Sequence, residues 1–241
     1  MGNSFWETQF VLAPPPAPVD RQGAVDLHLP GGDGPHPAVV VVHGAPLPPG
    51  APDPRDWLLF RGYGALLAEQ GVVAAVVSYQ VPEPAALPAA AEHIAGLVEQ
   101  VRADPRVDAD RVALWFFSGG SLLMADWLRT PPEWLRGIAA TYPLLVPLPG
   151  WDVDPRFRPA EALGAADGPP VILVRAGRDA LPGLLAGIDA FVARAARAGR
   201  PVRLIEAPDG QHGFDALDHT DQSRDAVRTA RDAVIALLRP A

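Results

Sequence analysis

The sequence predicts a three-layer α/β fold, in which helices cover both faces of a mostly parallel, twisted sheet. The chain has 241 residues, 49% hydrophobic and 20% charged, as expected for a single globular domain. Short apolar segments rich in valine alternate along it with segments whose apolar residues recur at helical spacing. Such alternation is typical of parallel strands joined by helical crossovers. We therefore expect residues 1–241 to form one α/β domain.

The N-terminal part contains the only segments that suggest antiparallel strands. Two short strands are expected at 10–12 and 25–29, separated by a Pro-rich loop at 13–20. The valine run at 38–42 is continuously apolar, as in a strand buried on both faces. A helix is expected at 57–70, closed by Gly71, and a second buried strand at 72–79. The parallel part of the sheet thus begins at residue 38.

Strands and helices then alternate to the C-terminus. Helices are expected at 87–102, 122–128, 185–198 and 224–238, and strands at 111–117, 138–142, 171–174 and 202–205. A Pro-rich insert at 143–170 interrupts the pattern and is too long for a plain connection. We expect it to shape a substrate pocket, although an ordered surface loop would explain its composition equally well.

Composition excludes several classes of function. The chain has no Cys and no Lys, which rules out disulfides, thiolate metal sites, cysteine nucleophiles, Schiff bases and P-loops. A net charge of −8 argues against nucleic acid or an anionic membrane as partner. The N-terminus resembles no secretory signal, and no apolar run would span a bilayer, so a cytoplasmic location is expected. The oligomeric state is left open between a monomer and a homodimer.

Polar residues that follow the strands are the candidates for chemistry, because ligands bind beyond the carboxyl ends of parallel strands. Ser118 follows the strand at 111–117 and precedes Gly119 and Gly120. A serine on a sharp strand-to-helix turn exposes its hydroxyl, while the N–H of the next residue can face an oxyanion. A helix N-cap is the alternative role for Ser118, and Ser121 offers an alternative register without the second glycine.

Two further strand ends carry an acid and a histidine. Asp179 follows the strand at 171–174, and His212 lies in a Gly-flanked loop after the strand at 202–205. Taken singly, these would be a turn aspartate and a surface histidine. Together with Ser118 they supply a nucleophile, a base and an orienting acid at three strand ends. Ala45, after His43 and Gly44 at the end of the 38–42 strand, is the candidate for a second oxyanion N–H.

With these residues identified, the chain resembles the α/β-hydrolase superfamily, and within it the dienelactone hydrolase-like small esterases. The resemblance covers about residues 25–240. It is carried by the strand into His43-Gly44, helix 57–70 with Gly71-Val72-Val73, Asp108–Leu114 leading into Ser118-Gly119-Gly120, Ala176-Gly177-Arg178-Asp179, and His212-Gly213-Phe214. The resemblance implies Ser118 as nucleophile, His212 as base and Asp179 as acid. It also implies Gly119 and Ala45 as backbone oxyanion donors, and no cofactor or metal.

One residue departs from the pattern of this superfamily. The G-x-S-x-G motif is met at Ser118 and Gly120, but Phe116 stands where the first glycine belongs. A phenyl group there is expected either to displace a neighbour or to point into the pocket. Phe116 therefore favours an alternative function, in which the same fold carries out a non-hydrolytic lyase, isomerase or cyclase reaction.

The sequence thus predicts a serine hydrolase of small esters or lactones with an apolar substrate pocket. The candidate pocket residues are His43, Gly44, Phe117, Trp151 and Tyr79, where Tyr79 could equally pack in the core. A non-catalytic ligand-binding module is the third hypothesis. Several other residues are expected to be structural: Trp115, Trp127 and Trp134 in packing, His28, His36, His93 and His219 without metal-ligand spacing, and Asp215, Asp218 and Asp221 in a solvated turn and helix N-terminus.

Overall fold

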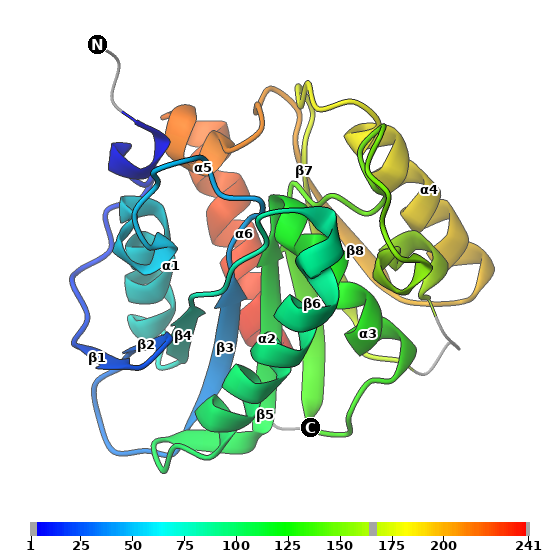
Figure 1. The fold of residues 1–241 in the computed structure, drawn as a ribbon. Helices are drawn as coiled ribbons and strands as arrows, with labels where there is room; N and C mark the ends of the chain where they lie inside the picture. The colour runs from blue at the N-terminus through cyan, green and yellow to red at the C-terminus, as the bar shows by residue number, and fades with distance from the viewer. Residues whose placement is uncertain (1–3, 164–167, 240–241) are drawn as a thin grey trace.

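The computed structural model describes residues 4–163 and 168–239. Its core is an eight-stranded sheet with the order β1-β2-β4-β3-β5-β6-β7-β8 (Figure 1). The strands are β1 Val19–Gln22, β2 Val25–His28, β3 His36–Val42, β4 Val73–Val77, β5 Val107–Phe117, β6 Leu135–Thr141, β7 Val171–Ala176 and β8 Val202–Ala207. Strands β1 and β2 pair antiparallel, as does β2 with β4, and every other described pairing is parallel.

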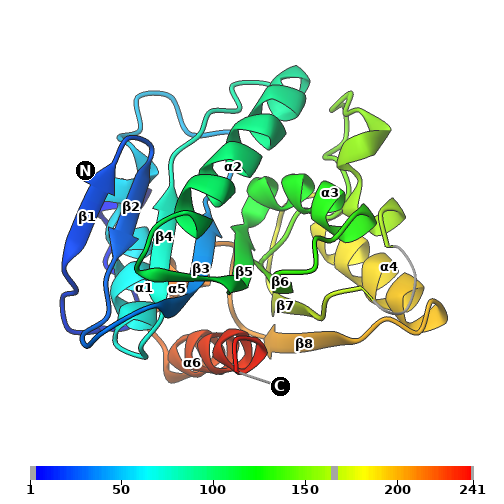
Figure 2. The same ribbon diagram turned by 90° about the horizontal axis from the view of Figure 1, so that it is seen from below.

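Helices cover both faces of this sheet, which gives three layers (Figures 1 and 2). One face packs against α1 (Leu58–Ala68), α5 (Phe214–Leu217) and α6 (Asp221–Leu237). The other packs against α2 (Leu87–Arg102), α3 (Met124–Arg129) and α4 (Leu184–Arg197). The expected helix–sheet–helix architecture with an antiparallel start is therefore confirmed. Among the described residues, no helix combines the length and apolar character needed to cross a bilayer.

The two faces follow directly from the pleat of the strands. In β3, Val40 and Val42 belong to the core on the α2 side, whereas Val39 and Val41 belong to the core on the α1 side. A strand whose alternate side chains meet two apolar layers must be apolar throughout, which explains the valine run. Trp115 lies in the α1-side core and donates its indole N–H to Thr141 Oγ1 at 2.9 Å.

The N-terminal region differs from the sequence prediction. Residues 10–12 form no strand, and the first strand is instead β1, whose residues Val19 and Asp20 fall within or beside the predicted loop. Phe10 and Val11 are apolar because they are buried in the α1-side core as irregular chain. Before them lies a short 3-10 helix, η1 (Phe5–Glu7). The apolar residues at 10–12 thus indicated burial, but this segment forms no hydrogen-bonded strand pairing.

The insert at 143–170 packs against α3 and α4, and its residues 164–167 lie outside the described part of the chain. It contains two short 3-10 helices, η5 (Pro155–Phe157) and η6 (Pro159–Glu161). The guanidinium of Arg156 pairs with Asp126 of α3 at 2.8 Å, and Arg129 donates to the carbonyl of Pro155 at 3.0 Å. The insert is thereby fastened to the domain beside the carboxyl edge of the sheet.

The ring of Phe116 does not point into the pocket. Its side chain is fully buried and belongs to the core on the α2 side, and it lines neither of the cavities described below. Strand pairing places it between Val42 and Ala140, with its ring on the face opposite to that of Phe117. The pleat therefore directs the phenyl group into the interior, so the expected narrowing of the pocket by this ring was wrong.

Phe116→Ala is expected to destabilise the fold by ~3–5 kcal/mol, because it removes a buried phenyl group from a packed core. The change should appear as a lower urea midpoint in unfolding followed by tryptophan fluorescence. Val19→Ala, at a position 46% exposed, is the control and should alter stability by less than about 0.5 kcal/mol. A cost of less than about 1 kcal/mol for Phe116→Ala would contradict its place in the core.

Candidate active site

Ser118 occupies the turn between β5 and the 3-10 helix η4 (Ser118–Leu123). Its backbone φ is +48°, in the left-handed region that a serine seldom adopts. This sharp turn presents the Oγ at the carboxyl edge of the sheet, where it lies 2.8 Å from Nε2 of His212. Ser121, the alternative serine, is fully buried, and its Oγ has no hydrogen-bond partner within the described residues.

Asp179 and His212 lie in the loops that follow two neighbouring strands, β7 and β8. Nδ1 of His212 lies 2.5 Å from Oδ2 of Asp179, whose side chain is completely buried. A carboxylate only accepts hydrogen bonds, so Nδ1 carries the proton and donates it to Asp179. Nε2 is then free to accept the hydroxyl proton of Ser118. The three predicted residues thus form one continuous chain of hydrogen bonds.

Two loops meet almost without clearance around Ser118. A side chain on Gly119 would overlap the carbonyl oxygen of Ala45, and one on Gly120 would overlap that of His43. A Cβ on Gly44 would lie only 3.1 Å from the Cβ of Ser118. The glycines are therefore required because two backbones touch here. Neither the Ala45 N–H nor the Gly119 N–H donates a hydrogen bond within the described residues.

A second close approach joins the loops that carry the acid and the histidine. A side chain on Gly177 would overlap the backbone of Pro208. The N–H of Arg178 donates to the carbonyl of Gly210 at 2.9 Å, and its guanidinium pairs with Asp209. These contacts fix the distance between Asp179 and His212, because each loop is held against the other immediately beside its functional residue.

Two predicted pocket residues lie elsewhere. His43 and Tyr79 are each about 1% exposed and stack on one another behind the Gly44–Ala45 loop, with ring centroids 4.2 Å apart. The Tyr79 hydroxyl donates to the His43 carbonyl at 2.7 Å, and His43 Nδ1 lies 2.7 Å from the Gly44 carbonyl. Burial lowers the pKa of His43 to about 4, so the ring is neutral. Placing these residues in the pocket was therefore wrong, and they support the loop instead.

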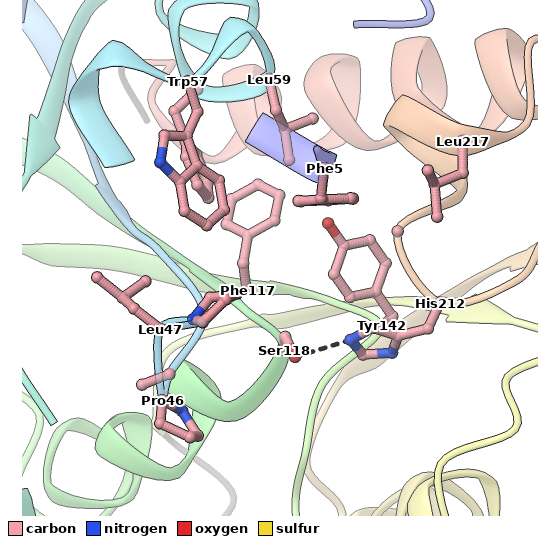
Figure 3. A pocket seen from close by; sticks show the side chains of 15 residues that line it. Phe5, Pro46, Leu47, Trp57, Leu59, Phe117, Ser118, Tyr142, His212 and Leu217 are labelled. Atoms are coloured by element: carbon pink, nitrogen blue, oxygen red, sulfur yellow. Dashed lines mark hydrogen bonds between the residues drawn. The ribbon is translucent and has the colours of Figure 1, made fainter. Parts of the chain in front are cut away.

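A cavity of about 290 Å³ opens above Ser118 and His212 (Figure 3). Gly44 and Phe117 line it, as the sequence analysis expected. The rest of its wall is mostly apolar. Pro46, Leu47 and Pro48 continue the loop after Gly44, and the other residues come from segments that the sequence did not associate with the site: Phe5, Trp57, Leu59, Phe60 and Leu217. Most of these residues precede or belong to α1, so the N-terminal third of the chain covers the site.

A second, smaller cavity of about 170 Å³ lies on the other side of Ala45 and Pro46, which line both cavities. Trp151, from the insert, and Gly119 line it, together with Leu87 and Leu122. Within the described residues, Trp151 is the insert's one contribution to either cavity. Of the two cavities, the insert therefore lines only the smaller one.

Sequence reasoning missed a buried polar cluster behind the histidine. The expectation that Asp215 is solvated was wrong, because its side chain is fully buried and accepts hydrogen bonds from the hydroxyls of Tyr63 at 2.8 Å and Tyr142 at 3.0 Å. The ring of Tyr142 packs against that of His212, with centroids 4.7 Å apart. Burial raises the pKa of Asp215 to about 6, despite the two hydroxyl donors. No local pattern distinguishes Asp215 from the exposed acids that follow it.

Metal-binding potential is limited to what the described residues offer. Among them, no group of three or more His, Asp or Glu side chains lies close enough together to hold a metal ion. His28 is buried and its pKa is lowered to about 4 by desolvation, so it is neutral and belongs to the interior.

Comparison with known proteins confirms the α/β-hydrolase fold. Esterase 2 of Thermogutta terrifontis phosphorylated by paraoxon matches with a TM-score of 0.72 and 19% identity, over 95% of this chain and 98% of that chain. Its butyrate-bound form matches at 0.68 and 19%, over 94% and 97%. DphMB1 matches at 0.70 and 21%, over 89% and 82%. No model of a known family and no curated protein matches the sequence.

The raised pKa of Asp215 predicts a specific pH dependence of stability. The folded chain keeps this proton up to about pH 6, whereas the unfolded chain loses it near pH 4. This group therefore stabilises the fold fully below about pH 4, and that stabilisation, ~3 kcal/mol, is lost as the pH rises to about 6. Asp215→Asn removes the titration, so stability relative to wild type should rise by up to ~3 kcal/mol between pH 4 and 7.

Urea unfolding of both proteins at pH 4 and 7 measures this difference, and contributions from histidines cancel because both proteins share them. Asp225→Asn, at a side chain 73% exposed, is the matched control, because it removes one carboxylate at the surface and leaves the buried cluster intact. A difference between Asp215→Asn and wild type that stays constant with pH would contradict the assignment.

Proposed function

We propose that the protein is a serine hydrolase that acts on small esters or lactones. The observation that carries this proposal is the continuous chain Ser118 Oγ–His212 Nε2 and His212 Nδ1–Asp179 Oδ2, at 2.8 and 2.5 Å. It lies at the carboxyl edge of the sheet, beside an apolar cavity. Ser118 is the nucleophile, His212 the general base and Asp179 the acid that orients the imidazole.

The reaction proceeds in two steps. Ser118 Oγ attacks the substrate carbonyl while its proton passes to His212 Nε2, and the tetrahedral intermediate then expels the leaving alcohol, which takes that proton. Water repeats the sequence on the acyl-enzyme, with His212 taking the water proton and returning it to Ser118. Throughout, buried Asp179 stabilises the imidazolium that forms when His212 holds the extra proton.

The oxyanion is held by the backbone N–H groups of Gly119 and Ala45. Both belong to the region where the two loops touch, and neither N–H is used in a hydrogen bond within the described residues. Fixed N–H dipoles that need not reorganise during the reaction favour the charge that develops on the carbonyl oxygen. Contact with Gly119 prevents Ala45 from moving independently, which keeps the two donors at a constant spacing.

The two cavities divide the substrate between them. His212 must protonate the leaving oxygen, so the leaving group occupies the cavity that His212 lines, of about 290 Å³. The acyl group then extends past Gly119 toward the cavity of about 170 Å³ beside Trp151. The small volume of this second cavity favours short acyl chains or lactones. The esterase 2 of Thermogutta terrifontis, which shares this fold, has been captured with butyrate bound.

Two observations bear on the alternatives. The non-hydrolytic alternative was suggested by Phe116, and the burial of its ring in the core counts against the version in which this ring points into the pocket. A ligand-binding module would have no use for an oriented serine–histidine–aspartate chain. The resemblance to dienelactone hydrolase-like enzymes remains a prediction about the substrate class.

The first test is intact mass spectrometry after treatment with a small fluorophosphonate. We expect a single adduct on the wild type and none on Ser118→Ala, because only a serine activated by His212 displaces the fluoride. Ser121→Ala is the matched control and should be labelled like the wild type. No adduct on folded wild type would overturn the hydrolase proposal and favour a non-hydrolytic or binding role.

Kinetics with nitrophenyl esters test the substrate class. We expect kcat/KM to be highest for acetate and butyrate and to fall with longer acyl chains, and Ser118→Ala to lower kcat by roughly 10⁴-fold or more. A survey in which only long-chain esters react would contradict the assignment of a small acyl cavity.

A further inference from the structure

We propose that Phe5, in the N-terminal helix η1, is the residue that limits the size of the leaving group. This inference rests on the proposed function, because it concerns the cavity that contains Ser118 and His212. Phe5 lies on the side of this cavity opposite Ser118, between Leu59 and Leu217 (Figure 3). It is an aromatic wall brought to the site from outside the sheet and its crossover helices.

The segment that follows Phe5 is firmly anchored. Phe10 is buried in a notch beside Gly62, where any side chain on that glycine would overlap the phenyl ring. Its ring packs against Tyr63 with a centroid distance of 4.8 Å. The N–H of Val11 donates to the backbone carbonyl of Asp215 at 2.9 Å. The N-terminal segment is therefore joined to α1 and to the helix that follows His212.

Toward the N-terminus from Phe10 and Val11, the chain passes over the cavity as helix η1. The helix is closed by reciprocal bonds: the Glu7 N–H donates to the Ser4 carbonyl at 2.9 Å, and the Ser4 N–H donates to the Glu7 carboxylate at 3.1 Å. Phe5 meets Trp57 edge to face, with centroids 5.8 Å apart. A Cβ on Gly213 would lie 2.9 Å from Cε2 of Phe5, so the ring packs directly on the residue after His212. Its position is fixed by both sides of the cavity.

Phe5 has a natural counterpart in the same helix. Trp6 also packs against Trp57, at 6.1 Å between centroids, and is half-buried like Phe5. Phe5 lines the cavity, whereas Trp6 does not. Loss of either ring would weaken the attachment of η1, but only loss of Phe5 would enlarge the space available to a leaving group. Comparing the two variants separates a specificity role from a purely structural one.

The test is a pair of kinetic series on wild type, Phe5→Ala, Phe5→Trp and Trp6→Ala. The first series consists of acetate esters whose alcohol is enlarged from methyl to octyl and to benzyl. The second consists of methyl esters whose acyl chain is lengthened. Phe5→Ala should raise kcat/KM for octyl and benzyl acetate by roughly 10-fold relative to methyl acetate, the scale of steric discrimination in an apolar pocket. Phe5→Trp should lower the same ratio. Neither variant should alter the acyl series, and Trp6→Ala should alter neither series.

Different results overturn different claims. If the wild type hydrolyses none of the esters, the proposed function fails, and this inference fails with it. If the wild type is active but the alcohol series is the same in Phe5→Ala, this inference alone fails. A similar shift in Trp6→Ala would also overturn it, because the effect would then come from loosening η1. Thermal unfolding of each variant checks that any loss of rate reflects the site and not the fold.

Discussion

The structure of the site depends on one contact, in which the backbone of residues 43–45 touches the turn at 118–120. The carbonyl oxygens of His43 and Ala45 occupy the space that side chains on Gly120 and Gly119 would need. This contact fixes the two N–H groups that we propose as oxyanion donors, and it lies beside Ser118, whose φ is positive. The stacked His43 and Tyr79 rings support it from behind, which explains why two polar aromatic side chains are buried there.

A second constraint connects parts of the chain that are far apart in sequence. The buried carboxyl group of Asp215 accepts hydrogen bonds from the hydroxyl of Tyr63 in α1 and from that of Tyr142 after β6. Its backbone carbonyl accepts a hydrogen bond from the N–H of Val11. A buried carboxyl group is costly unless its oxygens are satisfied, so the cluster forms as a unit or not at all. Because Asp215 follows His212 closely, the same cluster sets the position of the histidine loop and of the N-terminal segment that roofs the cavity.

Much of this arrangement could be predicted from local patterns. Strand alternation and valine runs indicated the sheet, and Ser118, Asp179 and His212 were found because each lies in the turn or loop after a strand, and these strands end at the same edge. Phe116 was harder to interpret, because a motif records which residue type is usual but not which way its side chain points. The pleat decided that its ring faces the core. Apolar residues 10–12 were mistaken for a strand, since burial of irregular chain gives the same local pattern.

By itself, the sequence determined the fold class, the order of the strands and long helices from residue 25 onward, and the three residues that form the hydrogen-bonded chain, because these depend on periodicity and on position relative to strand ends. Only the tertiary structure decided which side chains line the cavities, that His43 and Tyr79 lie behind the site, and that Phe5 lies above it. The physical reason is that these placements depend on contacts between segments far apart in the chain. Hydrophobicity favours burial of all of them, but it does not specify the surface against which each one packs.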